Sequence, residues 1–470
     1  MVAVPFPTSS ARGKFAESGG RLINAYAERL GDKRIKISRV PGVRSIVEVA
    51  DYTHCRGAIE INGVVLAALD ERLVTITLSG GNFIVNNIGA FSGSETVYFA
   101  RNNKSPTPDI VAVTDGTAFI VDMGTGASSY PDGDVGSPNS VCFIGGYFVF
   151  SYGNARMRAS GLNDTTINTL DTAFAESKPD GLLRVVALGS NLYACGPQTI
   201  EIWRNTGNAT GFPFSFLDTI NRGIASADAI AGSENDWSNV LQFAGSDNVA
   251  YRINGPNAEP ISNPSVSKDL ERLADKSTLR SVVYAHEGHS VWCLSCADWT
   301  WCSDVSTNEW FERASYGVDA FRVSASVKCF GSWVMGDSLT GKFGVVDPDY
   351  GYEFGDPLIL TVVSSTMTGF PSRAVLSRLN LDIMSGVGMA AGADPIETAP
   401  QVAMSVSHDG GVVFGNPRLR EIGQQGKYKK TVRYNRLGTA SAKGAQIKLV
   451  YSDPPPFSLF SGDIKVGARG

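Results

Sequence analysis

Histidine and cysteine side chains, the groups best suited to bind a transition metal, lie close together in one stretch of the sequence. They are His286, His289, Cys293, Cys296 and Cys302, and neutral imidazoles and thiolates are the ligands that zinc prefers. The apolar run that begins at His289 predicts a strand, in which residues three apart point to opposite faces. A zinc knuckle would need a turn between Cys293 and Cys296, and no glycine stands there. We therefore expect buried thiols beside a polar hairpin and no metal, with a zinc site as the alternative.

A second motif spans Ser407 to Phe414 and reads Ser-His-Asp-Gly-Gly-Val-Val-Phe. It nearly fits the Asp-box pattern Ser-x-Asp-Gly-Gly-x-x-Trp, which is found in sialidases and related propellers. In an Asp box the carboxylate accepts hydrogen bonds from its own turn, and the two glycines adopt positive φ. Because the motif contains no catalytic group, it predicts a structural hairpin.

Basic residues concentrate near the C-terminal end. Between Asn416 and Lys448, nine lysine and arginine residues stand against one acidic residue, in a chain whose formal net charge is −5. If the segment from Tyr428 to Tyr434 is a strand, Lys427, Lys429 and Arg433 share one face. Such a face either contacts DNA in a channel or an acidic neighbouring protein, or is the solvated side of an edge strand. The candidate contact residues are Lys427, Lys429, Lys430, Arg433 and Arg436.

Motifs of the common enzyme classes are missing. The sequence has no dinucleotide-binding Gly-x-Gly-x-x-Gly, no Walker loop, no Gly-x-Ser-x-Gly elbow and no His-Glu-x-x-His. We therefore expect neither an enzyme nor a cofactor.

The composition favours an all-β protein. The chain has 51 glycines and 22 prolines, and only 19% of its residues are charged, which is typical of many short strands joined by tight turns. The negative net charge excludes a general attraction to phosphate backbones. No secretory signal or apolar membrane span is evident, so we expect the protein to stay in the cytoplasm in which it is made.

The strand pattern predicts two kinds of domain. Groups of three short strands recur roughly every 40 to 50 residues, as expected for propeller blades, and Asn62-Gly63 is a strong hairpin signal in the first group. From Gly355 on, strands follow at wider spacing, which is typical of a β-sandwich. We predict an irregular segment at 1–50, a β-propeller of six or seven blades at 51–354, and a β-sandwich-like domain at 355–470.

A series of phrases in a fixed order carries a resemblance to a known family. It includes Thr199-Ile-Glu-Ile-Trp-Arg-Asn-Thr-Gly207, Asn221-Arg-Gly-Ile-Ala-Ser226 and Tyr251-Arg-Ile-Asn-Gly255, and it ends with Ile422-Gly-Gln-Gln-Gly-Lys-Tyr428 and Arg436-Leu-Gly438. In these phrases the chain resembles the tail hub proteins of short-tailed bacteriophages, also called packaged DNA stabilization proteins.

The resemblance implies a structural virion protein that attaches below the portal and adaptor, closes the DNA channel to retain the packaged genome, and docks the tail needle. It also implies a ring of like subunits, expected to be a hexamer. The implied partners are the adaptor, the needle, tail fibre or tailspike proteins and packaged DNA, and no membrane is involved. The expected location is the virion tail, after synthesis in the host cytoplasm.

The alternative is a tail-associated propeller that binds or cleaves glycans. The Asp box favours it, and so does an aromatic group composed of Trp292, Trp299, Trp301 and Trp310. Large rings are also the usual filling between sheets, so we expect at least some of these tryptophans in the core.

Overall fold

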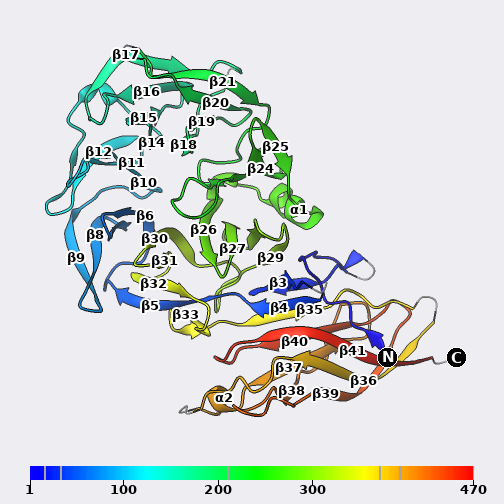
Figure 1. The fold of residues 1–470 in the computed structure, drawn as a ribbon. Helices are drawn as coiled ribbons and strands as arrows, with labels where there is room; N and C mark the ends of the chain where they lie inside the picture. Colours follow the sequence, from blue (N-terminus) through cyan, green and yellow to red (C-terminus); the bar gives the residue numbers. More distant parts are fainter. Residues whose placement is uncertain are drawn as a thin grey trace.

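The computed structural model describes residues 1–14, 17–31, 34–178, 180–208, 211–369, 372–390 and 394–468. A ring of small sheets stands beside a body of two packed sheets (Figure 1). The predicted all-β fold, a propeller followed by a sandwich, is confirmed.

The propeller has seven antiparallel blades of four strands within the described residues. Blade 1 contains β6 (Cys55–Ile61), β7 (Val64–Leu69), β8 (Arg72–Ser79) and β9 (Asn82–Ala90), and blade 2 contains β10 (Tyr98–Arg101), β11 (Ile110–Thr114), β12 (Thr117–Asp122) and β13 (Gly126–Ser129). Blade 3 contains β14 (Ser140–Ile144), β15 (Tyr147–Ser151), β16 (Arg156–Ser160) and β17 (Ile167–Phe174), and blade 4 contains β18 (Arg184–Leu188), β19 (Asn191–Cys195), β20 (Ile200–Asn205) and β21 (Phe214–Ile220).

Blades 5 to 7 complete the ring. Blade 5 contains β22 (Ile230–Ala231), β23 (Leu241–Ala244), β24 (Ala250–Asn254) and β25 (Asn257–Pro260). Blade 6 contains β26 (Arg280–His286), β27 (His289–Ser295), β28 (Thr300–Asp304) and β29 (Trp310–Glu312). Blade 7 contains β30 (Val323–Cys329), β31 (Ser332–Asp337), β32 (Lys342–Asp347) and the N-terminal strand β5 (Gly42–Glu48). The first strands of all seven blades line a central cavity of about 830 Å³.

The sequence pattern indicated only three strands per group, so the outermost strand of most blades was not predicted. In β25, three of the four residues are exposed, and in β21 four consecutive residues are exposed. A strand that faces water on most sides lacks the alternation of apolar and polar residues by which strands are found. The inner strands are mostly buried, and they pack blade against blade through clusters such as Val111, Phe148 and Phe150 between blades 2 and 3.

The prediction that residues 1–50 are irregular is wrong for the residues described. They form β1 (Val2–Ala3), β2 (Arg21–Ile23), β3 (Ala25–Arg29), β4 (Ile35–Arg39) and β5. Strand β5 pairs with β32, about 300 residues away, and thereby closes the ring of blades. The strands are short, and apart from the hairpin of β3 with β4 their partners are distant in sequence, so a local pattern does not reveal them.

The sandwich has two sheets. One contains β3, β4, β41 (Ser458–Ala468), β36 (Ala374–Ile383) and β39 (Val432–Ala440), with β1 on β41; the other contains β2, β35 (Leu360–Val363), β40 (Gln446–Tyr451), β37 (Gln401–Ser407) and β38 (Arg418–Glu421). The second sheet continues directly into blade 6, because β2 pairs with β29 at Ile23 and Glu312. One uninterrupted sheet therefore crosses from propeller to sandwich.

Few other elements interrupt the sheets. Strands β33 (Tyr352–Glu353) and β34 (Asp356–Pro357) extend blade 7, and two 3₁₀ turns lie at Gly133–Val135 and Lys276–Thr278. Helix α1 (Pro264–Arg272) is capped at its N-terminus by Asn263, whose side chain accepts hydrogen bonds from the backbone N–H groups of Ser265 and Val266. Helix α2 (Pro395–Thr398) lies at one end of the sandwich. Within the described residues, no helix is long and apolar enough to span a membrane.

Candidate functional site

The thiols of the histidine and cysteine stretch point into the core of blade 6. Cys293 on β27 lies opposite Cys302 on β28, and their sulfur atoms are 3.0 Å apart. Both side chains are fully buried, and burial raises the pKa of the Cys302 thiol well above its usual value. Cys296 follows β27 and is also buried. A buried thiol with a raised pKa is a poor nucleophile and a poor source of thiolate.

The two histidines flank the turn between β26 and β27, and they contact Asp304 and Tyr26 rather than the cysteines. His289 Nδ1 lies 2.7 Å from Asp304 Oδ2, and this hydrogen bond raises the pKa of His289. Burial lowers the pKa of His286 to about 3. The ring of Tyr26, on β3 of the sandwich, packs edge-on against both imidazoles. Among the described residues, no group of three or more His, Cys, Asp and Glu side chains is arranged to hold a metal.

The Asp box is a folded turn, as the sequence predicted. Asp409 accepts hydrogen bonds from the Ser407 hydroxyl at 2.6 Å and from the backbone N–H groups of Val412 and Val413 at 3.0 and 3.1 Å. These bonds, the Ser407 one foremost, lower the pKa of Asp409. Gly410 and Gly411 have φ of 79° and 92°, the region that glycine adopts without strain. The motif therefore stabilises its own loop.

The predicted basic strand face is wrong in its geometry. Lys427, Lys429 and Lys430 lie in the loop before β39, which begins only at Val432. Lys427 and Lys429 therefore do not share a strand face with Arg433. Gly426 has φ of 83°, and turn-forming residues at 424–426 outweigh the alternation that suggested a strand.

The five candidate residues differ in their contacts. Lys430 forms an ion pair with Glu421 and lowers the pKa of that carboxyl. Arg433 Nε donates to Asn380 Oδ1 at 2.9 Å, and Arg436 has φ of 55° within β39. Lys427 and Lys429 are exposed. The structure thus places the five in β39, the last strand of its sheet, and in the loop before it.

Arg418 and Arg420, which are not among the predicted contact residues, hold this edge together. Arg418 Nη1 donates to the backbone oxygens of Asn435 and Arg436 at 2.9 and 3.2 Å, and Arg420 Nε donates to that of Arg433 at 3.4 Å. Both arginines come from β38, whereas the oxygens belong to β39 in the other sheet. The arginines bridge two sheet edges, so part of the local positive charge has a structural role.

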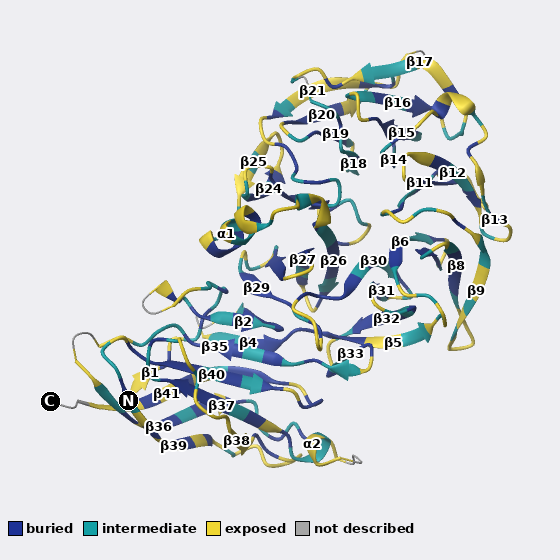
Figure 2. Ribbon diagram, turned by 180° about the vertical axis from the view of Figure 1, so that it is seen from behind, coloured by how far each residue is buried: buried dark blue, intermediate teal, exposed yellow. Residues whose placement is uncertain are grey.

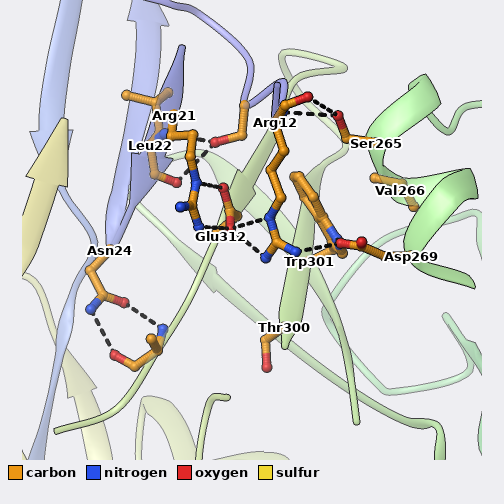
Figure 3. A network of polar contacts seen from close by, with 12 residues as sticks. Arg12, Arg21, Leu22, Asn24, Ser265, Val266, Asp269, Thr300, Trp301 and Glu312 are labelled. Atoms are coloured by element: carbon orange, nitrogen blue, oxygen red, sulfur yellow. Dashed lines mark hydrogen bonds and ion pairs between the residues drawn. The ribbon is translucent and has the colours of Figure 1, made fainter. Parts of the chain in front are cut away.

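A polar network at the junction of the two domains was also missed (Figure 3). Arg12 lies between Asp269 of α1, at 2.5 Å, and Glu312 of β29, at 2.6 Å, and its guanidinium lies 4.9 Å from the centre of the Trp301 ring. Arg21 of β2 binds the same Glu312 at 2.7 Å. Burial raises the pKa of Glu312, but Arg21 and Arg12 outweigh burial and hold the pKa below its usual value. The network ties the N-terminal segment, α1, blade 6 and the sandwich together.

The aromatic group does not form a sugar-binding platform. Trp292, Trp299, Trp301 and Trp310 all have 6% or less of their surface exposed. Trp310 packs at steep angles against both Trp292 and Trp301, as rings do in a core. The charges that line the central cavity nearly cancel: five basic residues, Arg56, Arg101, Arg184, Arg280 and Lys328, stand against four acidic ones, Glu60, Asp228, Glu234 and Asp236.

Comparison with known structures gives alignments over 65% of the chain. The WD40 β-propeller domain of Doa1 aligns with a TM-score of 0.42 and 8% identity, covering 65% of this chain and 96% of its own. The computationally designed Ika8 protein aligns with a TM-score of 0.39 and 13% identity, covering 65% of this chain and 99% of its own. No curated protein matches the chain.

Comparison with protein families is decisive. Residues 21–351 match the family described as bacteriophage P22 Gp10, β-propeller, and residues 364–467 match bacteriophage P22 Gp10, β-sandwich. The two matches follow each other in the order in which the domains are built. The chain therefore belongs to the bacteriophage P22 Gp10 family, the structural tail and DNA stabilization proteins of short-tailed phages.

Proposed function

We propose that this chain is the tail hub of its virion, which attaches below the portal and adaptor, closes the DNA channel and docks the tail needle. The observation that carries the proposal is the family match over both domains, 21–351 and 364–467. The sheet that runs from blade 6 through β2 into the sandwich supports it. A plug under the pressure of packaged DNA must not bend between the end that contacts the adaptor and the end that contacts the needle. A sheet shared by both domains resists such bending.

The rest of the molecule suits a passive structural role. A closed propeller removes long free sheet edges, so subunits can pack side by side in a ring, here proposed as a hexamer, without uncontrolled polymerisation. The net charge of −5 leaves few sites that would grip DNA during ejection. The role needs no cofactor, reactive centre or membrane. It places the protein in the virion tail after synthesis in the host cytoplasm, with tail fibre or tailspike proteins as further neighbours.

The basic edge of the sandwich is the proposed contact with a partner or with packaged DNA. Lys427 and Lys429 are exposed and are the central candidates. Arg433 and Arg436 are exposed as well, and Arg433 donates to Asn380, whereas Lys430 is half-buried and pairs with Glu421. Reversing the charge of Lys427 and Lys429 should weaken docking onto adaptor-bearing particles, measured by co-sedimentation. The control is Lys268→Glu on α1, an exposed lysine far from this edge in sequence. Equal docking of all variants would show that the lysines are only solvated.

The function itself is tested on particles assembled without this chain. Packaging should proceed, and the self-repulsion of close-packed phosphates should then drive the genome out. Electron microscopy should show mostly empty heads, with DNA sensitive to nuclease, and adding purified protein soon after packaging should restore filled heads. A protein that only binds or trims glycans would leave stable, full heads that fail at adsorption. A majority of stably full heads would refute the hub assignment.

A further inference from the structure

Two thiols in the core of blade 6 lie closer together than an ordinary non-bonded contact. Cys293 on β27 lies directly opposite Cys302 on β28, and their sulfur atoms are 3.0 Å apart. Non-bonded carbon atoms are optimally about 3.5 to 4.0 Å apart, and sulfur is larger than carbon. The sulfur atoms of a disulfide are about 2.05 Å apart. The separation of the two thiols thus lies between van der Waals contact and a covalent bond.

The backbone positions of the two residues also suit a disulfide. The Cys296 N–H donates to the Trp299 carbonyl oxygen at 3.0 Å and closes the hairpin of β27 and β28. Hydrogen-bonded and non-hydrogen-bonded pairs alternate from there, so Cys293 and Cys302 form a non-hydrogen-bonded pair. The Cα atoms of such a pair are about 4.5 Å apart, within the range of about 4.4 to 6.8 Å found in disulfides. Bond formation therefore needs rotation of the side chains and no rearrangement of the strands.

The other cysteines have no such partner. They are Cys55, Cys142, Cys195, Cys296 and Cys329, and all of them lie within the described residues. The Cys55 and Cys195 thiols each contact a backbone oxygen at 3.8 Å. Cys296 follows β27, and residues three apart in an extended chain point to opposite faces, which separates it from Cys293. The close contact is thus specific to one pair.

Burial controls how the pair can react. Both side chains are fully buried, and β27 is almost entirely buried (Figure 2). Burial also raises the pKa of the Cys302 thiol well above its usual value, and the thiolate is the form that oxidants attack. An oxidant therefore reaches the pair only when blade 6 opens locally, so that the reaction is slow and selects small oxidants.

We propose that Cys293 and Cys302 form a disulfide after the protein leaves the host cytoplasm, where thiols are kept reduced. The oxidant is hydrogen peroxide, a molecule little larger than water. One thiol, as the thiolate, attacks a peroxide oxygen, breaks the O–O bond and becomes a sulfenic acid, and one water leaves. The other thiol attacks the sulfenic sulfur, forms the S–S bond and expels the sulfenic oxygen as a second water. Two thiols thus lose two hydrogen atoms, and one peroxide is reduced to two waters.

The bond lies in the sheet that joins the two domains. Strand β28 pairs with β29, and β29 pairs with β2, which pairs in turn with β35 of the sandwich. A crosslink between β27 and β28 restricts the unfolded chain and so opposes the separation of these strands. The inference rests on the proposed function only for the passage from the host cytoplasm to a released virion.

Peptide mapping tests the bond. Purified protein is kept reduced or treated with excess hydrogen peroxide, the peroxide is removed with catalase, and the protein is unfolded in iodoacetamide and digested with trypsin. Residues 281–313 form one tryptic peptide that contains Cys293, Cys296 and Cys302, because the only Lys or Arg in it is Arg313. Mass spectrometry should find three alkyl groups on the reduced peptide. After oxidation it should find one, on Cys296, and treatment with dithiothreitol should restore three.

Two matched variants identify the pair. Cys296→Ala should still form the bond, whereas Cys302→Ala should form no disulfide in this peptide. Oxidation should raise the midpoint of thermal denaturation by a few degrees in the wild type and leave that of Cys302→Ala unchanged. In infected cells quenched with acid the wild-type peptide should be reduced, and in released particles it should contain the bond.

Four results would overturn the inference: three alkyl groups after oxidation, a bond that includes Cys296, a sulfinic acid in place of the bond, or released particles that keep both thiols. Each is read from the same peptide of the wild type, so the test does not depend on the folding of a variant. None of them bears on genome retention, which the count of full and empty heads measures. The hub function can therefore stand or fall separately.

Discussion

At the scale of single residues, Glu312 of blade 6 joins the propeller to the N-terminal segment. Its side chain is 4% exposed and binds two arginines that come from different parts of the N-terminal segment. A buried carboxylate costs free energy unless it is paired, and here both partners approach from the more exposed side. The two ion pairs offset the cost of burying this carboxylate, and they hold Arg12 and Arg21 on blade 6.

Replacing Glu312 by Gln should therefore lower the free energy of unfolding by about 1 to 3 kcal/mol at neutral pH. Because the pKa of Glu312 is held below its usual value of 4.5, its contribution is complete above that value and is lost as the pH falls through the folded-state pKa. The difference between wild type and Glu312→Gln in urea denaturation should thus shrink in acid. A difference that is constant from pH 7 to about pH 3 would contradict this assignment.

The buried thiols lead to a second prediction at this scale. Purified protein should contain far less than one zinc per chain, because Cys293 and Cys302 contact each other in the core, His289 binds Asp304, and both histidines pack on Tyr26. Cys293→Ser should cost about 1 to 3 kcal/mol, the cost of a polar group in an apolar site. Elemental analysis measures the zinc, and a stoichiometric amount would be the contrary result.

At the scale of elements, β5 closes the propeller with a strand from the other end of the chain. Arg44 is exposed, and its backbone pairs with Val345 of β32, because the neighbouring Val43 carbonyl points the other way and accepts from the Phe354 N–H. Arg44→Pro removes a donor from this closing pair and should cost about 3 kcal/mol or more. Ser128→Pro makes the same change in β13, which pairs only within blade 2, and should cost less. Thermal denaturation compares the two, and equal losses would mean that ring closure adds nothing.

The basic edge separates arginines that act in the fold from lysines that do not. Arg418→Ala removes the hydrogen bonds to the backbone oxygens of Asn435 and Arg436. It should lower the free energy of unfolding by about 1 kcal/mol. Lys429→Ala removes an exposed charge and should be nearly neutral. Denaturation of both variants under the same conditions makes the comparison, and a neutral Arg418→Ala would remove its assigned role.

At the scale of the whole molecule, propeller and sandwich form one folding unit. The sheet from β26 to β38 passes through both domains, and one large core cluster includes Trp292 of blade 6, Leu22 of β2 and Leu449 of β40. Calorimetric heating should therefore give a single transition, although small domains joined by loops usually unfold separately. Two well-resolved transitions would show that the shared sheet does not couple the domains.

Local patterns in the sequence were sufficient for the all-β class, the order of propeller and sandwich, the Asp-box turn and the family. Inner blade strands are consecutive hairpins, so their apolar runs and turn residues are adjacent in the chain. The Asp box is likewise complete within a few residues, from Ser407 to Val413. Each of these features depends on interactions between sequence neighbours, which a pattern of residues can display.

Tertiary structure alone decided the number of blades, the place of the N-terminal strands and the contacts of the charged residues. Strand β5 is a strand because β32 lies open beside it, and Glu312 is buried because Arg12 and Arg21 reach it from about 290 to 300 residues away. Lys427 and Lys429 leave the predicted strand because the turn at Gly426 takes the chain from one sheet to the other. The physical reason is common to all three: pairing energy between distant segments outweighs local propensity, and the sequence does not show which distant segments meet.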